Sequence, residues 1–274
     1  MNRRQFLRAS LPVTAPLLMS RATQAQTPAS APASVPAPAA DGWIALFNGR
    51  NLDGWYSFLQ RSGRGAAEKN GYVTVENGLL HIMGRDVPNE PVESGYLSTL
   101  AEFENVRIRV EYKWGMKRFA PRLENKRDNG LLYYVGGEDK VWPRCIECQI
   151  QETDTGDVFF LGGTRGIQGT LPGNGGGGFP RLINGATGPM QPTSARLLKD
   201  GDFEKLDDWN TVEVITQGNQ ATHLVNGRIV NLLKNLEQAD AQNAGQFVTV
   251  TKGRIGIEIE FAEIWYRRID VKPL

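Results

Sequence analysis

The chain is poor in Cys and His, the residue types that structural zinc sites and disulfide chemistry need. Of its 274 residues only two are Cys and two are His, and the formal net charge is +1. The lone Cys-x-x-Cys at Cys145 and Cys148 lacks the second ligand pair of a structural zinc site. Residues three apart in a strand point to opposite faces, so we expect two reduced thiols. No basic run or basic amphipathic helix indicates binding to nucleic acid or a membrane surface.

The first 40 residues have the pattern of a targeting signal followed by a spacer. The pair Arg3 and Arg4 precedes an apolar stretch, Leu11–Met19, that is too short to span a bilayer, and small residues lead up to Ala25. This order predicts a Tat-type signal peptide and a periplasmic or otherwise exported protein, with no transmembrane segment in the mature chain. Loss of the four leader arginines changes the formal net charge to −3. The predicted organisation is a signal peptide at 1–25, a Pro/Ala-rich linker at 26–40 and one domain at 41–274.

Strand patterns dominate after residue 40. Apolar and charged residues alternate cleanly through 106–114, and Asn77-Gly78 and Asn226-Gly227 are hairpin signals between apolar runs. We therefore predict an all-β fold, a sandwich of two antiparallel sheets. Residues 232–244 are the best candidate for a helix. A long Gly/Pro-rich segment, 162–192, is either a lid over a site or a disordered insert.

Several polar side chains are candidates for a site. In the strand predicted at 145–151, Glu147, Gln149 and Gln151 share one face, which is either a sugar-binding surface or a solvated polar face. The acidic turn after it, with Glu152, Asp154 and Asp157, either binds a divalent cation or is solvated. His223 lies across a predicted hairpin from Glu213, and a carboxylate that orients a histidine makes a credible base. Lys113 lies on the polar face of its strand, where it is either part of a site or a solvated lysine.

The order of several strings resembles one family. The mature chain opens with Gly42-Trp43-Ile44-Ala45-Leu46-Phe47-Asn48-Gly49-Arg50-Asn51-Leu52-Asp53-Gly54-Trp55, in which we expect a short strand, a tight turn and a return. Further matching strings lie around 94–97, 111–114, 128–132, 142–157, 208–214, 223–227 and 272–274. Together they resemble the bacterial 3-keto-disaccharide hydrolase domain, whose members are also described as 3-keto-glucoside lyase/hydratases. The resemblance implies a concanavalin A-like jelly roll for residues 41–274.

The resemblance also implies a chemistry. A ketone at C3 acidifies the C2 hydrogen, a base removes it, the C1 aglycone leaves by β-elimination, and hydration of the glucal completes a net hydrolysis. On this reading the catalytic residues are His223, Glu213 and Glu147, and the substrate-binding residues are Gln149, Gln151, Lys113, Asn129 and Asp154. The partner is a small carbohydrate that an upstream sugar 3-dehydrogenase would supply.

No cofactor is required by the sequence, and a divalent cation stays open, with no metal ligands assigned. Two other functions also stay open. One is a non-catalytic carbohydrate-binding module, because jelly rolls bind sugars on their polar and aromatic faces. The other is a glycosidase that uses two carboxylates at a fixed separation.

Overall fold

The computed structural model describes residues 35–84, 87, 92–169 and 189–274. The predicted leader and residues 26–34 of the predicted linker lie outside the described residues. So does most of the Gly/Pro-rich segment 162–192, although Thr164–Gln168 forms a strand and Gln191 makes an isolated bridge with Gly166. No helix in the described part of the chain is long and apolar enough to cross a bilayer.

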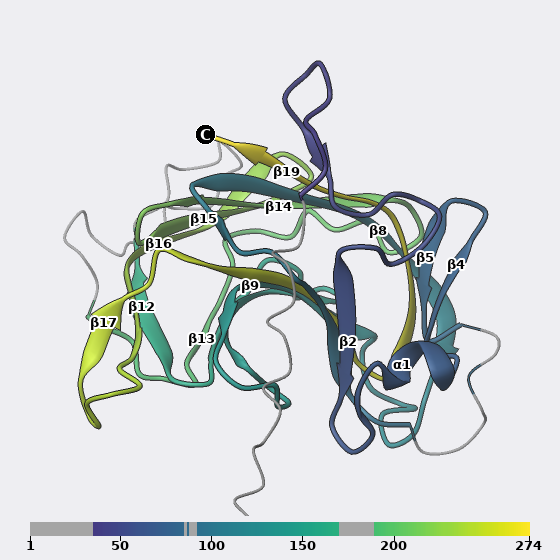
Figure 1. Cartoon of the computed structure of the whole chain (residues 1–274), viewed down its shortest axis with the longest axis horizontal. Coiled ribbons are helices and arrows are strands. Elements are labelled where there is room, and N and C mark those ends of the chain that lie inside the picture. The colour runs from purple at the N-terminus through teal and green to yellow at the C-terminus, as the bar shows by residue number, and fades with distance from the viewer. Residues whose placement is uncertain (1–34, 85–86, 88–91, 170–188) are drawn as a thin grey trace, which may run out of the picture. The chain divides into compact units, whose positions relative to one another are not determined.

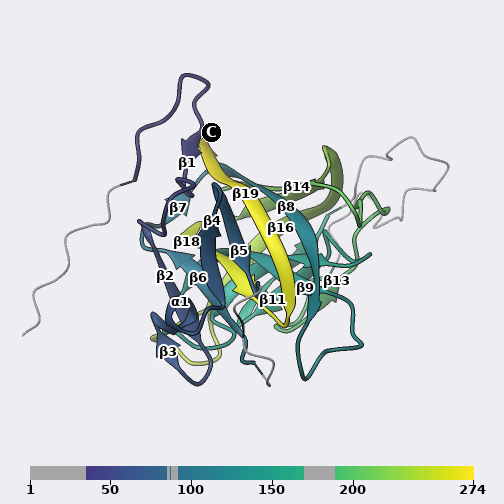
Figure 2. The same ribbon diagram turned by 90° about the vertical axis from the view of Figure 1, so that its right-hand side faces the viewer.

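Two large antiparallel sheets form the fold, as predicted (Figures 1 and 2). In Figure 1 the strands β14, β15 and β16 run across the top of the view, and β9 of the other sheet lies below them. Sheet A has ten strands in the order β12-β16-β15-β14-β8-β19-β5-β4, with β1 beside β19 and β17 beside β16. Its bounds are β1 Ile44–Ala45, β4 Val73–Glu76, β5 Leu79–Ile82, β8 Val106–Arg118, β12 Thr164–Gln168, β14 Asn210–Gln217, β15 Gln220–Val225, β16 Arg228–Ala239, β17 Phe247–Thr249 and β19 Ala262–Pro273.

Sheet B has nine strands in the order β13-β11-β10-β9-β18-β6-β2-β3, with β7 beside β18. The single helix among the described residues, α1 (Ala66–Lys69), contacts β2 and β4. The bounds of sheet B are β2 Trp55–Leu59, β3 Gly63–Arg64, β6 Gly95–Thr99, β7 Phe103–Glu104, β9 Asp128–Gly136, β10 Arg144–Gln151, β11 Val158–Leu161, β13 Arg196–Leu197 and β18 Lys252–Ile259.

The main core lies between the two sheets. On β8 the alternate residues Val106, Ile108, Val110, Tyr112 and Trp114 are buried in it, so the charged residues between them lie on the outer face of sheet A. The predicted Asn-Gly hairpins are confirmed. Asn77 and Gly78 join β4 to β5 with φ of 51° and 82°, and Asn226 and Gly227 join β15 to β16 with φ of 49° and 79°. Both turns need the positive φ that Asn and Gly tolerate.

The opening segment is not a hairpin, and that expectation was wrong. Strand β1 pairs with β19 in sheet A, whereas β2 pairs with β6 in sheet B. The turn at Asn48 therefore carries the chain from one sheet to the other. The Asn48 side-chain oxygen accepts hydrogen bonds from the backbone N–H groups of Arg50 (2.8 Å) and Asn51 (2.9 Å). Such bonds stabilise an Asx turn equally well when no strand pairing follows.

The predicted helix at 232–244 is also wrong, because Arg228–Ala239 forms the strand β16. Residues 234 and 237 pair with Ile167 and Arg165, so β16 holds one extra residue at this point. Asn235 lies in this bulge with φ 50°. The bulge shifts the alternation by one residue, so Leu233 and Leu236 both reach the core. Their spacing resembles that of a helix in the sequence.

Trp55 links the opening segment to the core. Its ring is 7% exposed, and its indole Nε1 donates a 2.7 Å hydrogen bond to the carbonyl of Leu46. We expect Trp55→Phe to lower the free energy of unfolding by about 1–3 kcal/mol, because the carbonyl loses its donor inside the protein. Urea unfolding measures this loss. Trp43→Phe is the matched control, since Trp43 is only half-buried and stacks against the Arg109 guanidinium at 3.8 Å. Equal losses in the two variants would contradict the prediction.

Candidate functional site

The outer face of β10 carries the predicted polar side chains. Ile146, Cys148 and Ile150 point into the main core, so Glu147 and Gln149 point away from it. Both are nevertheless 5% exposed. Cys145 and Cys148 are free, buried and on opposite faces, as the strand pattern predicted.

Two carboxyl groups meet over a glycine on this face. Gly130 of β9 pairs with Gln149, and the neighbouring pair Leu131 and Ile257 places Glu258 on its other side. A Cβ atom on Gly130 would lie 2.7 Å from Glu147 Oε1 and 2.9 Å from Glu258 Oε2. The absence of a side chain at Gly130 therefore lets carboxyl groups from two strands converge above β9.

Two more carboxyl groups extend the site by one step along the strands. Asp128 lies two residues from Gly130 on β9, and Glu260 lies two residues beyond Glu258, so both side chains are on the same face. The Arg122 guanidinium bridges them, at 2.7 Å from Asp128 Oδ2 and 2.9 Å from Glu260 Oε1. We call Asp128, Glu147, Glu258 and Glu260 the carboxylate cluster.

Burial and mutual repulsion favour the protonated forms of the cluster. Burial raises the pKa of Glu147 well above its usual range, and the charges of Glu260 and Asp128 raise it further. Burial and the same neighbours, with Glu147, raise the pKa of Glu258. Burial and Asp128 raise the pKa of Glu260 to about 7, against the opposing charge of Arg122. The cluster therefore holds both protonated and ionised carboxyl groups near neutral pH.

Several buried polar atoms of this face have no hydrogen-bond partner among the described residues. They are Asp128 Oδ1, Gln149 Oε1, Glu258 Oε2 and the Nε and Nη2 atoms of Arg254. Buried polar atoms in proteins are normally paired, so such a concentration on one face indicates a surface that binds a polar ligand.

An apolar patch lies beside the carboxylate cluster on the same face. Its buried members are Tyr56, Tyr96, Leu132, Val135 and Cys145, with Phe58, Trp142 and Leu161 packed against them. Asp139 Oδ1 accepts hydrogen bonds from the hydroxyls of Tyr56 and Tyr96, each at 2.8 Å. Polar groups next to aromatic rings are typical of sites that hold small ligands.

His223 lies in the core, away from this face. It is 0% exposed, and its Nε2 lies 3.0 Å from the Tyr133 hydroxyl. The predicted contact between His223 and Glu213 is not formed, so that prediction was wrong. His223 pairs with Val214, and Glu213 points to the outer face of sheet A, where Arg107 holds it with two 2.8 Å hydrogen bonds. His223 shares its face of sheet A with its partner Val214. Because adjacent residues of a strand point to opposite faces, Glu213 lies on the face opposite to His223.

Burial lowers the pKa of His223 to about 3. We therefore expect its ring to stay neutral between pH 5 and 8, because the interior disfavours the imidazolium. Its Cε1 proton should show no titration in NMR spectra over that range, and a His223→Gln variant identifies the signal. A shift of the resonance near pH 6.5 would contradict the buried position.

The other predicted residues are dispersed. Lys113 lies on the outer face of sheet A, on the opposite side of the sandwich from Glu147. Asn129 is 0% exposed and points inward, where it accepts from the Tyr266 hydroxyl (2.6 Å) and donates to the carbonyl of Glu258 (2.8 Å). It thus tethers β9, β18 and β19, and the structure gives it no contact with the outer face.

The acidic side chains of the turn after β10 form ion pairs with neighbouring Lys and Arg residues. Asp154 pairs with Lys126 (2.8 Å) and Arg196 (3.1 Å), and Glu152 pairs with Arg127 (2.6 Å). These cations hold the pKa of Asp154 and of Glu152 below the usual range, against the effect of burial. Within the described residues, no group of three His, Cys, Asp or Glu side chains is arranged to hold a metal ion. Dependence on a divalent cation stays a prediction.

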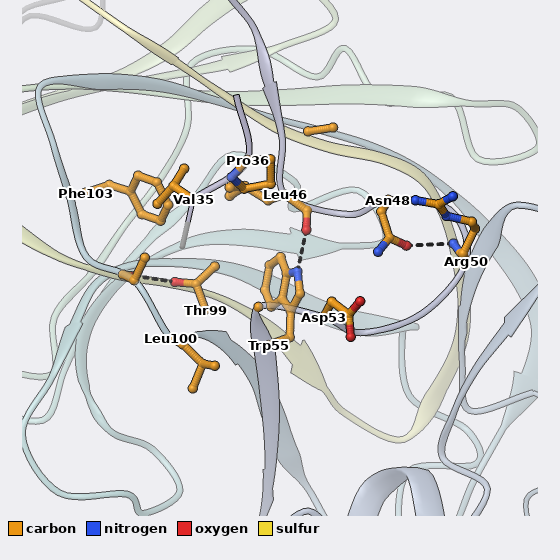
Figure 3. A pocket seen from close by; sticks show the side chains of 13 residues that line it. Val35, Pro36, Leu46, Asn48, Arg50, Asp53, Trp55, Thr99, Leu100 and Phe103 are labelled. Atoms are coloured by element: carbon orange, nitrogen blue, oxygen red, sulfur yellow. Dashed lines mark hydrogen bonds between the residues drawn. The ribbon is translucent and has the colours of Figure 1, made fainter. Parts of the chain in front are cut away.

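A cavity beside the opening segment is separate from the cluster (Figure 3). It has a volume of about 530 Å³ and is lined by Asn48, Arg50, Trp55, Thr99 and neighbours, but by none of the four carboxyl groups. Its hydrogen-bonding groups are largely in use. Trp55 donates to Leu46, and Thr99 donates to the carbonyl of Ala101. We assign no chemistry to it.

Sequence reasoning missed Glu258, Glu260 and the arginines of this face. A signal was present, because Ile255, Ile257 and Ile259 alternate with Glu258 and Glu260 just as the apolar residues of β10 alternate with Glu147. The alternation predicts a strand with one polar face. It does not indicate which strands lie beside Gly130, because strand pairing depends on residues far apart in the sequence.

Residues 42–272 match the family described as the 3-keto-alpha-glucoside-1,2-lyase-like domain, and the chain belongs to that family. It is a carbohydrate-active enzyme family, which agrees with the resemblance found in the sequence.

The chain is similar to several solved structures. A candidate glycosyl hydrolase from Parabacteroides distasonis is 17% identical with a TM-score of 0.50, over 86% of this chain and 95% of that one. A second from the same organism is 20% identical with a TM-score of 0.48, over 85% and 99%. The carbohydrate-binding module CBM66 from Bacillus subtilis is 8% identical with a TM-score of 0.45, over 80% and 95%. No curated protein matches the chain.

Proposed function

We propose that the chain cleaves 3-keto-glycosides by removing the C2 proton and eliminating the C1 substituent, and that the carboxylate cluster does this chemistry. One observation carries the proposal: Glu147 and Glu258 present carboxyl oxygens 2.7 Å and 2.9 Å from one point above Gly130. The reaction takes a proton at C2 and gives one to the oxygen on C1, the neighbouring carbon. Two adjacent carboxyl groups, one ionised and one protonated, match that demand.

The surroundings supply the other functions. The charges of Glu147, Glu258 and Glu260 influence one another's protonation. An ionised member of this group can accept the proton from C2, and a protonated member can donate one to the leaving oxygen. The amide of Gln149, in the row of Gly130, is placed to donate a hydrogen bond to the C3 oxygen as negative charge develops there. Lys113 has no part in this, because it lies on the other sheet.

The same pair of carboxyl groups also suits a second function, a glycosidase acting on unoxidised sugars. Retaining glycosidases place two carboxyl groups about 5–5.5 Å apart, and the convergence over Gly130 permits such a spacing. One assay separates the two functions. The protein is incubated with a 3-keto-glucoside and with its unoxidised parent in deuterated water, and the products are followed by mass spectrometry.

Under the proposal, only the 3-keto substrate is cleaved, and its C2 position gains deuterium in recovered substrate or product. Cleavage of the parent sugar would establish the glycosidase. Binding of either sugar without cleavage or exchange would establish a carbohydrate-binding module and refute the proposal.

A further inference from the structure

Two residues that the proposed function does not use, His81 and Lys113, lie in one row across the outer face of sheet A. Trp265 of β19 pairs with His81 of β5 on one side and with Lys113 of β8 on the other. Strand β14 pairs with β8 and begins one residue after Trp209, in a register that places Trp209 beside Lys113. Figure 2 shows β5, β19 and β8 side by side. The row therefore holds two tryptophans with a lysine between them.

The indole of Trp265 is held against the ring of His81. The two ring centroids are 3.3 Å apart, and the planes are 13° from parallel. His81 is fixed in turn, because its Nδ1 lies 3.1 Å from Glu76 Oε1 and its Nε2 lies 2.9 Å from Glu263 Oε1. His81 is 3% exposed, whereas Trp265 is half-buried. The exposed part of the indole therefore lies on the side away from His81.

The indole of Trp209 is supported in a similar way. Arg267 Cζ lies 4.6 Å from the centroid of the ring, and Arg267 Nε donates a 2.6 Å hydrogen bond to Glu111. Trp209 is also half-buried. The Lys113 ammonium between the two tryptophans has no hydrogen bond, ion pair or ring contact with any described residue. Two strand spacings separate the tryptophans, which places their Cα atoms about 10 Å apart. The row thus presents two fixed indole rings and an unused donor.

We infer that Trp265, Lys113 and Trp209 form a second carbohydrate-binding site, which takes an extended chain of β-linked glucose units. Equatorial substituents leave both faces of such a sugar ring apolar, so the faces pack on indole rings, and the hydroxyl groups accept hydrogen bonds from the ammonium group. The distance between the tryptophans is comparable to the length of a disaccharide, so one chain can contact both rings. The site lies on the opposite side of the sandwich from the carboxylate cluster. It anchors the protein to a polysaccharide and does not depend on the proposed function.

Calorimetric titration of the full chain with unoxidised sugars tests the site without requiring turnover. The probes are cellotetraose, maltotetraose and methyl β-D-glucoside. We expect cellotetraose to bind about tenfold or more tightly than the monosaccharide, because only the longer probe reaches both indole rings. Cellotetraose should also bind more tightly than maltotetraose, since α-1,4 linkages curve a chain away from a straight row of contacts.

The variants Trp209→Ala and Trp265→Ala should each weaken cellotetraose binding about tenfold or more, and Lys113→Met should weaken it to a smaller extent. Because loss of the Trp265 ring uncovers His81, melting curves check that the variants fold, and Trp265→Phe, which keeps a ring, should retain part of the affinity. Trp43→Ala is the matched control. Trp43 is also half-buried and stacked on an arginine, but it precedes β1 and lies outside the row. Its variant should bind cellotetraose as the wild type does.

Equal affinity for cellotetraose and the monosaccharide would overturn the inference, as would equal affinity for the two tetrasaccharides or unchanged binding in Trp209→Ala. Binding that is lost in Glu147→Gln but kept in Trp209→Ala would place the sugar on sheet B and would also overturn it. The proposed function is tested separately. Trp209→Ala should cleave a small 3-keto-glucoside at the wild-type rate, because the carboxylate cluster lies on the other sheet. Absence of cleavage by the wild type would refute that function and leave the second site standing.

Discussion

Replacement of Glu147 by Gln is expected to lower kcat on a 3-keto-glucoside by about 10²- to 10⁴-fold, the usual contribution of a positioned acid or base. Glutamine keeps the shape of the side chain but can neither accept the C2 proton nor share a proton with Glu258. The fold should survive, because removal of one group from a repulsive buried cluster relieves strain on the others.

Initial rates measured by mass spectrometry, together with deuterium exchange at C2, give the size of this loss. Glu111→Gln is a matched control. Glu111 is partly buried and hydrogen-bonds to Arg267, and it lies on the outer face of sheet A. Its variant should keep wild-type rates. If Glu147→Gln also kept them, the reaction would have to take place elsewhere on the protein.

Replacement of Glu260 by Gln is expected to change how stability depends on pH. The pKa of Glu260 is about 7 in the folded protein, raised by burial from an ordinary value of 4.5. The folded state therefore holds its proton over a pH range where the unfolded chain has lost it. The stability from this group is fully present below pH 4.5 and is lost as pH rises through 7, by roughly 3 kcal/mol.

Glutamine at position 260 does not titrate, so the variant does not lose this contribution as pH rises. The free energy of unfolding of the variant minus that of the wild type should therefore increase by roughly 3 kcal/mol from pH 4.5 to pH 8. Urea unfolding at several pH values measures the difference between the two proteins, in which the effects of titrating groups outside the carboxylate cluster, His223 included, cancel. Glu111→Gln should show no comparable divergence from the wild type. Parallel curves for wild type and Glu260→Gln would refute the raised pKa.

The polar face of β10 could be predicted because it depends on a local rule. Successive side chains of a strand alternate between faces, and the apolar residues at 146, 148 and 150 left only one face for Glu147 and Gln149. The Asn-Gly hairpins were predictable for a similar reason, since their positive φ angles need particular residues. The export signal of the first 25 residues is also a local pattern, and it stays a prediction.

His223 and Lys113 show where local rules stop. Both lie on predicted strands, but alternation says only that two faces exist, and the packing of the two sheets decides which face becomes core. One face of β15 packs into the core between the two sheets, and His223 lies on that face. It is therefore buried where a substrate cannot contact it. The failed hairpin at the opening segment has the same origin, because both of its strands found partners far away in the sequence.

Local residue patterns were enough to predict most of the strands, most of their turns, the inward and outward sides of β10, and the resemblance to a carbohydrate-active family. Which side chains meet depends on how the strands pair in space. Glu147 and Glu258 are more than a hundred residues apart, and they converge because β9 pairs with β10 on one edge and with β18 on the other. Their raised pKa values follow from that meeting, since burial and repulsion between charges depend on distances in space and not on separation along the chain.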